Sequence, residues 1–204
     1  MTKPYVYVGV DLGQRRDYSA IAVLEPAEVL TGEFDYEYRV PKKRLQYFVR
    51  HLERLRRGSP YPEVVHRIDA LVRKLSETCY VVVAVDAGGP GMPVVDLLRK
   101  AHMPCTLNAV IITGGSLEAR VHGVYTVPRK DLLQTIKLVL QTSQLRIPAE
   151  MPGSKDLLEE LGTLKLTGGG DNHDDLAFAL SLALWRARKG KTQGKSLDEI
   201  LPHF

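Results

Sequence analysis

The sequence contains few of the residues whose abundance would place it in a specialised class of protein. Its 2 cysteines, Cys79 and Cys105, lie far apart with no CxxC pair and no zinc-type spacing, so they indicate buried thiols in a reducing compartment. The 6 histidines show no pattern of metal ligands either. No apolar stretch approaches the roughly 20 residues that a membrane helix requires, and the N-terminus lacks the apolar region of a signal peptide. We therefore expect a cytoplasmic protein that makes no membrane contact.

The chain also carries little excess charge, because 28 lysines and arginines against 24 acidic residues leave a formal net charge of +4. With 204 residues, 44% of them hydrophobic, it has the size and composition of one globular domain. The cations are unevenly spread: 7 of them fall between Lys42 and Arg57, a stretch in which Glu53 is the only acidic residue. Such a run is usually a solvated helix face, but its single sign favours a surface that binds a polyanion.

Hydrophobic periodicity predicts a mixed α/β domain with a largely buried central sheet. The predicted strands are Val6–Asp11, Ala20–Leu24, Phe34–Val40, Tyr80–Val85, Leu107–Thr113, Leu145–Ile147 and Thr163–Thr167. The predicted helices are a basic helix over Pro41–Arg57, a core-facing helix over Val64–Leu75, and the segments Val94–Lys100, Pro128–Gln141, Lys155–Leu161 and His173–Lys189. The stretch Gly114–Thr126 is predicted to be a hairpin or a mobile loop. Residues 1–189 would form the domain, and 190–204 a flexible tail with a short terminal helix.

Aspartates stand at three places where a regular element meets a turn. Asp11 ends the first strand, Asp86 ends the strand over Tyr80–Val85, and Asp174 with Asp175 opens the last long helix. Carboxylates at the carboxyl ends of buried strands lie at the mouth of an α/β sheet, where such folds bind their ligands. Each motif alone is weak, because aspartate and glycine are ordinary turn residues and acids suit a helix start. Together they would form a negative site that suits Mg²⁺ and a phosphate ester.

The sequence around these acids resembles the nuclease domain of phage terminase large subunits, which has a ribonuclease H-like (resolvase/integrase) fold. The resemblance spans about residues 5 to 189 and rests on the stretches Val-Gly-Val-Asp11-Leu-Gly, Asp86-Ala-Gly-Gly-Pro-Gly, Val127-Pro-Arg-Lys-Asp-Leu, Leu145-Arg-Ile-Pro and Asn172-His-Asp-Asp-Leu-Ala. The last of these is the most specific. The resemblance as a whole implies an α/β fold in which a central mixed sheet is flanked by helices.

The resemblance also implies a metal-dependent endonuclease that cleaves double-stranded DNA by two-metal-ion phosphodiester hydrolysis. Its cofactor would be two Mg²⁺ or Mn²⁺ ions, with Asp11 as the ligand that bridges both. The catalytic and metal-binding residues would be Asp11, Asp86 and Asp174, with Asp175 as a further metal ligand. DNA phosphates would be contacted with little reading of bases, by Arg15, Arg16, Lys42, Lys43, Arg44, Arg129 and Lys130.

The chain departs from the terminase pattern because it contains no ATPase motor. Its nearest approach to a phosphate loop, Gly190–Ser196, has 3 residues between its glycines where four are required. Either the chain is an excised or stand-alone nuclease domain, or the motor is a separate chain. In the second case the partners, besides DNA, would include a separate ATPase motor or a portal or packaging protein, in the host cytoplasm if the gene is a phage's.

Three alternatives differ from this expectation. The first is a Holliday-junction resolvase-like nuclease with the same fold and metals but branched DNA as substrate. The second is an actin-like ATP-binding fold, although 204 residues allow only one of the two lobes that it needs. The third is a non-catalytic module that binds DNA or a protein partner, in which the acids merely cap structure and metal does not stabilise the fold.

Overall fold

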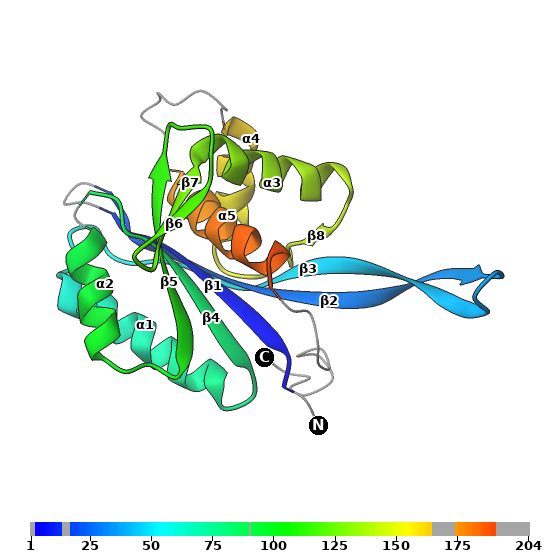
Figure 1. Cartoon of the computed structure of the whole chain (residues 1–204), viewed down its shortest axis with the longest axis horizontal. Helices are drawn as coiled ribbons and strands as arrows, with labels where there is room; N and C mark the ends of the chain where they lie inside the picture. The colour runs from blue at the N-terminus through cyan, green and yellow to red at the C-terminus, as the bar shows by residue number, and fades with distance from the viewer. Residues whose placement is uncertain (1–2, 14–16, 90, 165–173, 191–204) are drawn as a thin grey trace.

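The computed structural model describes residues 3–13, 17–89, 91–164 and 174–190, and in these ranges the chain builds one mixed sheet. The order of its strands is β6-β7-β5-β4-β1-β2-β3-β8 (Figure 1). Their bounds are β1 (Tyr5–Asp11), β2 (Ala20–Asp35), β3 (Val40–Arg54), β4 (Tyr80–Asp86), β5 (Cys105–Thr113), β6 (Ala119–Val121), β7 (Val124–Pro128) and β8 (Leu145–Arg146). The predicted α/β class with a central mixed sheet is confirmed.

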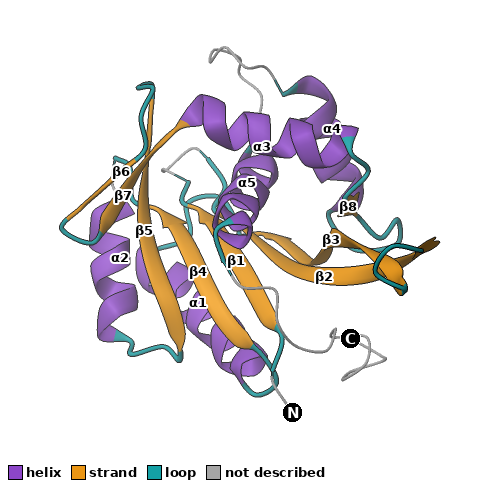
Figure 2. Cartoon of the chain, turned by 45° about the vertical axis from the view of Figure 1, so that its right-hand side comes forward, coloured by secondary structure: helices purple, strands orange, loops and turns teal. Residues whose placement is uncertain are grey.

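Helices cover both faces of this sheet (Figure 2). On one face, α1 (Tyr61–Ser76) and α2 (Gly91–Lys100) share an apolar cluster with β1, β2 and β4. On the other face lie α3 (Arg129–Gln141), α4 (Ser154–Thr163) and α5 (Asp175–Arg188). Helix α5 is buried over nearly its whole circumference, with only Arg186 and Arg188 reaching outward. A helix that is apolar all round belongs in the core, so α5 forms the centre of this layer.

The strand directions bring several carboxyl ends to one edge of the sheet. β1, β4, β5 and β7 run parallel to one another. β2 is antiparallel to both β1 and β3, so β3 also runs in the direction of β1. The ends of these strands, Asp11, Asp86, Thr113 and Arg54, therefore face the same side of the molecule. This edge is where ligands bind in α/β folds.

A glycine lets α5 lie directly on β1. A Cβ atom at Gly9 would overlap the carbonyl oxygen of Ala179 and would come within 2.8 Å of the backbone nitrogen of Ala183. Only glycine permits such an approach of two backbones. Gly9 lies two residues before Asp11, so this contact sets the distance between the start of α5 and the end of β1.

The basic helix predicted over Pro41–Arg57 is wrong, and so is the strand predicted over Phe34–Val40. Residues 36–39 are the turn of a hairpin, and Val40–Arg54 is strand β3. The turn lacks a glycine; instead the Asp35 carboxylate accepts hydrogen bonds from the backbone of Glu37 and Tyr38 at 3.0 and 3.1 Å. Beyond its pairing with β1 and β8, this hairpin projects from the body as a two-stranded arm, residues 26–46 (Figure 1).

A β-bulge interrupts the alternating pattern of β3. Val23 pairs with His51 and Leu24 pairs with Val49, so Arg50 is an extra residue in β3. Before the bulge, Tyr47 and Val49 are buried at a spacing of two, and the next residue of the same cluster, Leu52, follows after three. This part of β3 therefore lacks the strict alternation that marks a strand in a sequence.

Most of the remaining elements agree with the predictions or lie outside the described residues. Gly114–Thr126 contains the β6–β7 hairpin, one of its two predicted alternatives. The strand predicted over Thr163–Thr167 is wrong where it can be checked, because Thr163 ends α4 and Leu164 has no regular structure, while residues 165–167 lie outside the described ranges, as does the tail from residue 191 onward. Across the described parts of the chain, no helix combines the length and apolar character needed to span a membrane.

Candidate active site

Asp11 and Asp86 end neighbouring parallel strands. β1 and β4 pair in register up to Val10 and Val85, so the next residue of each strand is an aspartate. Both side chains are partly buried. The two carboxylates that the sequence predicted to be close therefore adjoin at the carboxyl edge of the sheet.

An open cavity of about 390 Å³ joins these carboxylates to residues from three other elements. Its remaining lining comes from the end of β5 and the loop after it, from the first residue of α3 and from α5: Ile112, Thr113, Gly114, Arg129 and Phe178. The cavity thus has acids from the two central strands together with one arginine. Such a combination suits a phosphate group that is accompanied by cations.

The environment of Asp11 disfavours its ionised form. Burial raises the pKa of the Asp11 carboxyl well above its ordinary value, and the nearby carboxylates of Asp86, Asp175, Glu160 and Asp17 raise it further. Charged groups of one sign that crowd a poorly solvated site repel one another. A cation bound there would relieve this repulsion.

Asp86 is held by the turn that follows it. Burial raises the pKa of the Asp86 carboxyl, while a hydrogen bond from the backbone N–H of Gly88 to Oδ1, at 2.8 Å, acts in the opposite direction. The turn continues into α2 at Gly91, where a Cβ atom would crowd the carbonyl oxygen of Asp86. One oxygen of Asp86 is thus committed to the turn, which fixes the orientation of the carboxylate.

Asp174 and Asp175 lie at the start of α5, as predicted. Asp174 is the N-cap residue and Asp175 the first helical residue, with 8% of its surface exposed. Asp175 is close enough to Asp11 to raise the pKa of that residue. Asp175, predicted only as a further metal ligand, therefore lies within electrostatic reach of Asp11.

The cap of α5 comes from a residue that sequence reasoning missed. Glu160 of α4 is 6% exposed, and its Oε2 accepts a hydrogen bond of 2.7 Å from the backbone N–H of Ala177 in the first turn of α5. Its Oε1 contacts the guanidinium of Arg54, which also donates to Asp156 at 3.1 Å. Burial raises the pKa of the Glu160 carboxyl, and the bonds from Ala177 and Arg54 oppose that rise. No sequence motif marks Glu160; only its place in the fold does.

Arg129 is a predicted DNA contact that the structure places beside the acids. Its guanidinium lies over the ring of Phe178, 4.2 Å from the centroid, and both residues line the cavity of Asp11 and Asp86. Within the described residues its Nε atom is buried without a hydrogen-bond partner. Stacking on an aromatic ring holds an arginine in place while leaving donors for a ligand.

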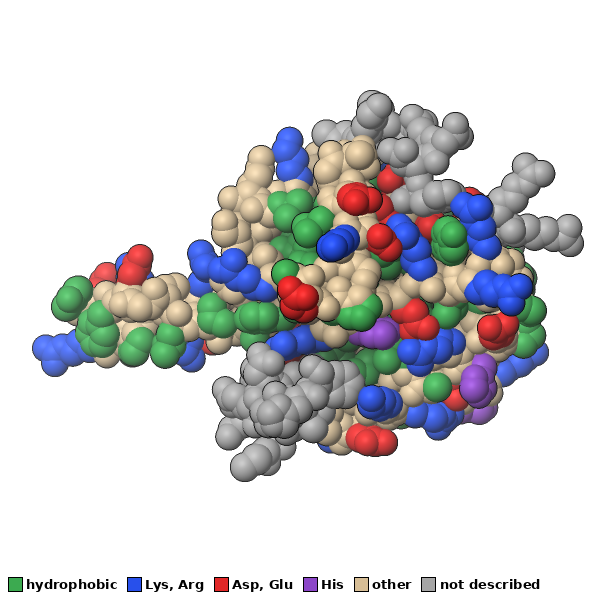
Figure 3. All heavy atoms as spheres, turned by 180° about the vertical axis from the view of Figure 1, so that it is seen from behind, with side chains coloured by type: hydrophobic (Ala, Val, Ile, Leu, Met, Phe, Trp, Pro, Cys, Tyr) green, Lys and Arg blue, Asp and Glu red, His purple; other side chains and the backbone are tan. Residues whose placement is uncertain are grey.

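The other predicted DNA contacts that the structure describes, Lys42, Lys43, Arg44 and Lys130, do not line this cavity. Lys42, Lys43 and Arg44 belong to the arm, where Lys42 pairs with Glu33 at 3.3 Å and Lys43 pairs with Glu28 at 3.4 Å. At about 3.3 Å per residue, Lys43 lies roughly 35 Å along β3 from Arg54. Figure 3 shows apolar and charged side chains mixed along this arm. Lys130 is exposed at the start of α3, and Arg15 and Arg16 lie outside the described residues.

The donor chemistry of the site fits a hard divalent cation. Asp11, Asp86 and Asp175 supply only carboxylate oxygens, the ligands that Mg²⁺ and Mn²⁺ prefer. Among the described residues, however, no three acidic, histidine or cysteine side chains are arranged around one point that could hold an ion. Mg²⁺ is commonly held by one or two carboxylates together with water, so Asp11 and Asp86 could serve as its protein ligands.

Comparison with known proteins supports the fold. No family model matches the chain, and no curated protein matches it either. Among solved structures, the chain is similar to the large terminase nuclease from thermophilic phage G20c, solved with bound zinc. That match has 20% identity and a TM-score of 0.56, and it covers 90% of this chain and 81% of the phage chain.

A second similar structure is a mutant nuclease domain of the large terminase subunit of bacterial virus Sf6, solved with manganese and beta-thujaplicinol. It is 12% identical with a TM-score of 0.52, and the match covers 90% of this chain and 88% of that one. The yeast mitochondrial Holliday junction resolvase Ydc2 matches at 10% identity and a TM-score of 0.40, over 89% and 79% of the two chains. The chain thus has the ribonuclease H-like fold of large terminase nuclease domains, as the sequence predicted.

Proposed function

We propose that the protein is a divalent-metal-dependent endonuclease that hydrolyses phosphodiester bonds of double-stranded DNA. The observation that carries this proposal is the cavity in which Asp11 and Asp86, from adjacent strands, lie with Arg129. The terminase nucleases of similar fold were solved with zinc or manganese. Asp11 and Asp86, with Asp175 or Asp174, would hold two Mg²⁺ or Mn²⁺ ions, which would activate water and stabilise the leaving oxygen.

Different residues would bind the scissile phosphate and hold the carboxylates in position. The guanidinium of Arg129 would donate to non-bridging oxygens of the scissile phosphate and stabilise the negative charge that grows during hydrolysis. The Gly88 hydrogen bond keeps Asp86 oriented. Glu160 and Gly9 together fix the start of α5 near Asp11, through the Ala177 hydrogen bond and the Ala179 contact.

The capping of α5 argues against the non-catalytic alternative. In that alternative, the acids at the start of α5 serve only to satisfy the end of a helix. In the structure Glu160 performs this task by accepting the Ala177 N–H. Asp174, at the N-cap position, makes no side-chain capping hydrogen bond, and a bound cation would offset the repulsion between Asp175 and Asp11.

The proposal extends to partners and location. Duplex DNA would be gripped through its phosphates, and a separate ATPase motor or a portal or packaging protein would deliver it. The protein would act in the cytoplasm, and in the host cytoplasm if the gene is a phage's.

Metal binding tests the proposal without reference to cleavage. We expect Mn²⁺ to raise the melting temperature of the wild type, because an ion that binds only the folded state stabilises it by RT ln(1 + [L]/Kd). Asp86→Asn should lose most of this rise. Asp96→Asn, which alters an exposed acid of α2 paired with Arg99, should keep it. A wild type that melts at the same temperature in EDTA and in Mn²⁺ would contradict the proposal.

A further inference from the structure

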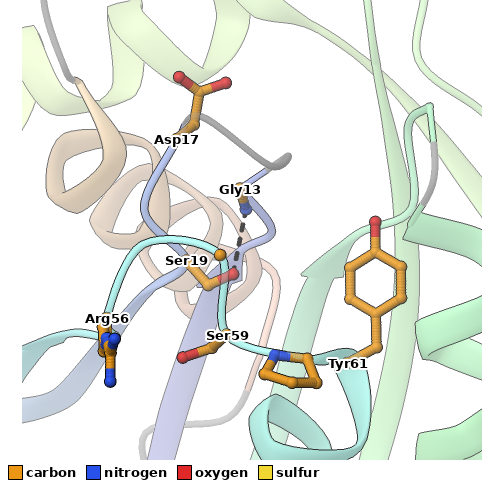
Figure 4. Close-up of a pocket in the computed structure, with 8 residues that line it drawn as sticks. Gly13, Asp17, Ser19, Arg56, Ser59 and Tyr61 are labelled. Atoms are coloured by element: carbon orange, nitrogen blue, oxygen red, sulfur yellow. Dashed lines mark hydrogen bonds between the residues drawn. The ribbon is translucent and has the colours of Figure 1, made fainter.

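A second cavity opens on the other side of the Asp11 strand, at the same edge of the sheet. It measures about 230 Å³, and the residues that matter for its chemistry are Gly13, Asp17, Ser19, Arg56, Ser59 and Tyr61 (Figure 4). One wall comes from Gly13, Asp17 and Ser19, and the other is the loop from β3 into α1. Two hydrogen bonds hold the first wall and join it to the second: Gly13 N–H to Ser19 Oγ at 3.2 Å, and Leu55 N–H to the Ser19 carbonyl at 2.8 Å.

The groups that face this cavity are mainly hydrogen-bond donors. Among the described residues, the guanidinium of Arg56 and the hydroxyls of Ser59 and Tyr61 make no hydrogen bond or ion pair. Arg56 is exposed, so its charge is available to a ligand from solvent. The one acid, Asp17, points its carboxylate away from Ser59 and Tyr61 (Figure 4). The cavity therefore offers a cation and two hydroxyls to an anion.

The surroundings reinforce this positive character. Arg57 follows Arg56 and lies over the ring of Tyr18, 4.7 Å from its centroid, and Arg54 approaches the same ring at 5.7 Å. Three arginines thus stand within four residues at and just after the end of β3, which β2 separates from the strand that carries Asp11. By contrast, the arm cations Lys42 and Lys43 are paired with glutamates. Arg54 is paired with Asp156 and Glu160, and Arg56 is the cation of this segment that lines the cavity among the described residues.

The size of the cavity limits the ligand. About 230 Å³ is smaller than the cavities that enclose drug-sized molecules, which run from about 300 to 1,000 Å³. It suits a single phosphate group better than a nucleobase with its sugar. Arginine and hydroxyl donors are the usual protein partners of phosphate oxygens in DNA.

We propose that this cavity binds a backbone phosphate of the DNA near the cleaved one, with Arg56, Ser59 and Tyr61 as its donors. The inference rests on the proposed function, because the DNA is brought here by the neighbouring active site. Gly13 lies two residues beyond Asp11, so a strand held at Asp11 passes this cavity as it continues along the sheet edge. The contact would hold the duplex in position and would carry no sequence information.

The test measures duplex DNA binding in EDTA by fluorescence anisotropy, at several salt concentrations. Loss of one phosphate contact should lower the slope of log K against log salt by about 0.9. We expect Arg56→Gln to show this decrease. Lys100→Gln removes one exposed charge at the end of α2, near the opposite edge of the sheet, and should leave the slope unchanged. Tyr61→Phe should weaken binding severalfold without changing the slope, because it removes a donor and no charge.

The outcomes separate this inference from the proposed function. If the wild type cleaves DNA but Arg56→Gln keeps the wild-type slope, the cavity contact is wrong and the nuclease stands. If Arg56→Gln and Lys100→Gln lower the slope equally, the effect is diffuse surface charge and the inference also fails. Stabilisation of the wild type by inorganic phosphate, with unchanged DNA slopes, would assign the cavity to free phosphate and overturn the DNA contact. A lower slope for Arg56→Gln in a protein that never cleaves would keep the contact and reject the nuclease.

Discussion

Glu160 and Ala177 connect two helices at the rim of the candidate active site. The buried carboxylate on α4 accepts the backbone N–H in the first turn of α5 at 2.7 Å, and Arg54 from the end of β3 contacts its other oxygen. Three elements therefore meet at one side chain. The first residues of α5 are preceded by Asp174 and begin with Asp175. Glu160 therefore connects the end of β3 to the segment that carries these two acids.

Replacement of Glu160 should separate its capping role from its charge. Glu160→Ala leaves the buried Ala177 N–H without its acceptor, which should lower the free energy of unfolding by about 2 kcal/mol. Glu160→Gln keeps an acceptor and removes a carboxylate that is costly to bury, so it should lose less than about 1 kcal/mol. Urea denaturation measures the free energy of unfolding of both variants. Glu159→Ala, which alters the exposed neighbouring residue, is the control. Equal losses for the Ala and Gln variants would show that the cap is not what matters.

The contact between Gly9 and Ala179 predicts a large effect from one added methyl group. In Gly9→Ala the new Cβ would overlap the α5 backbone, so the helix must shift away from β1. We expect a loss of about 3 kcal/mol in the free energy of unfolding, and a weaker thermal stabilisation by Mn²⁺. Gly162→Ala is the matched control: it lies in α4 with no atom within 4 Å of the new Cβ, and should be neutral or stabilising by up to about 1 kcal/mol. Similar stabilities for the two variants would contradict the close contact.

The raised pKa of Asp11 predicts how stability depends on pH in the absence of metal. Because the folded state holds this proton more tightly than the unfolded chain, the free energy of unfolding should fall as pH rises from about 4, the ordinary pKa of aspartate, through the higher folded-state pKa. Asp11→Asn removes the buried charge. In EDTA at pH 8 it should exceed the wild type in stability by on the order of 1 kcal/mol, and the difference should vanish near pH 4. Thermal melts across this pH range test the prediction. An Asp11→Asn variant that is less stable than the wild type at pH 8 would contradict it.

Arg129 and Lys43 should differ sharply in their effect on cleavage. Arg129 lines the cavity of Asp11 and Asp86, so Arg129→Gln should slow single-turnover cleavage of a duplex by about 10²-fold. Lys43 is paired with Glu28 on the arm, far along β3, so Lys43→Gln should change the rate by less than about twofold. The assignment of Lys42, Lys43 and Arg44 to DNA binding stays a prediction that this comparison tests. Equal losses for the two variants would place the DNA on the arm as well.

The sequence was informative where local pattern and burial agree. The apolar runs that end in Asp11 and Asp86 predicted two adjacent strands, and the apolar segment after Asp175 predicted the central helix. β3 could not be predicted, because its first residues are exposed and mostly charged and the bulge at Arg50 interrupts its two-residue alternation. The turn of the hairpin has no glycine and follows Asp35, while Gly32, with a positive φ of 81°, lies at a register shift within the hairpin.

In the candidate site, too, some residues could be predicted from the sequence and others could not. Carboxylates at strand ends can be located because every strand ends at an edge of the sheet. Glu160 could not be found, since its partners Arg54 and Ala177 are 106 and 17 residues away in the chain. Likewise, the stacking of Arg129 on Phe178 depends on how α3 and α5 meet, which no local pattern encodes.

The most direct measurement is cleavage of supercoiled plasmid in Mg²⁺, Mn²⁺ or EDTA by the wild type, Asp86→Asn and Asp96→Asn. The account predicts metal-dependent nicking by the wild type and by Asp96→Asn, and none by Asp86→Asn, because Asp86 adjoins Asp11 in the cavity while Asp96 is an exposed acid of α2. No cleavage in any metal, or equal cleavage by Asp86→Asn, would contradict the claim that these carboxylates form a nuclease active site.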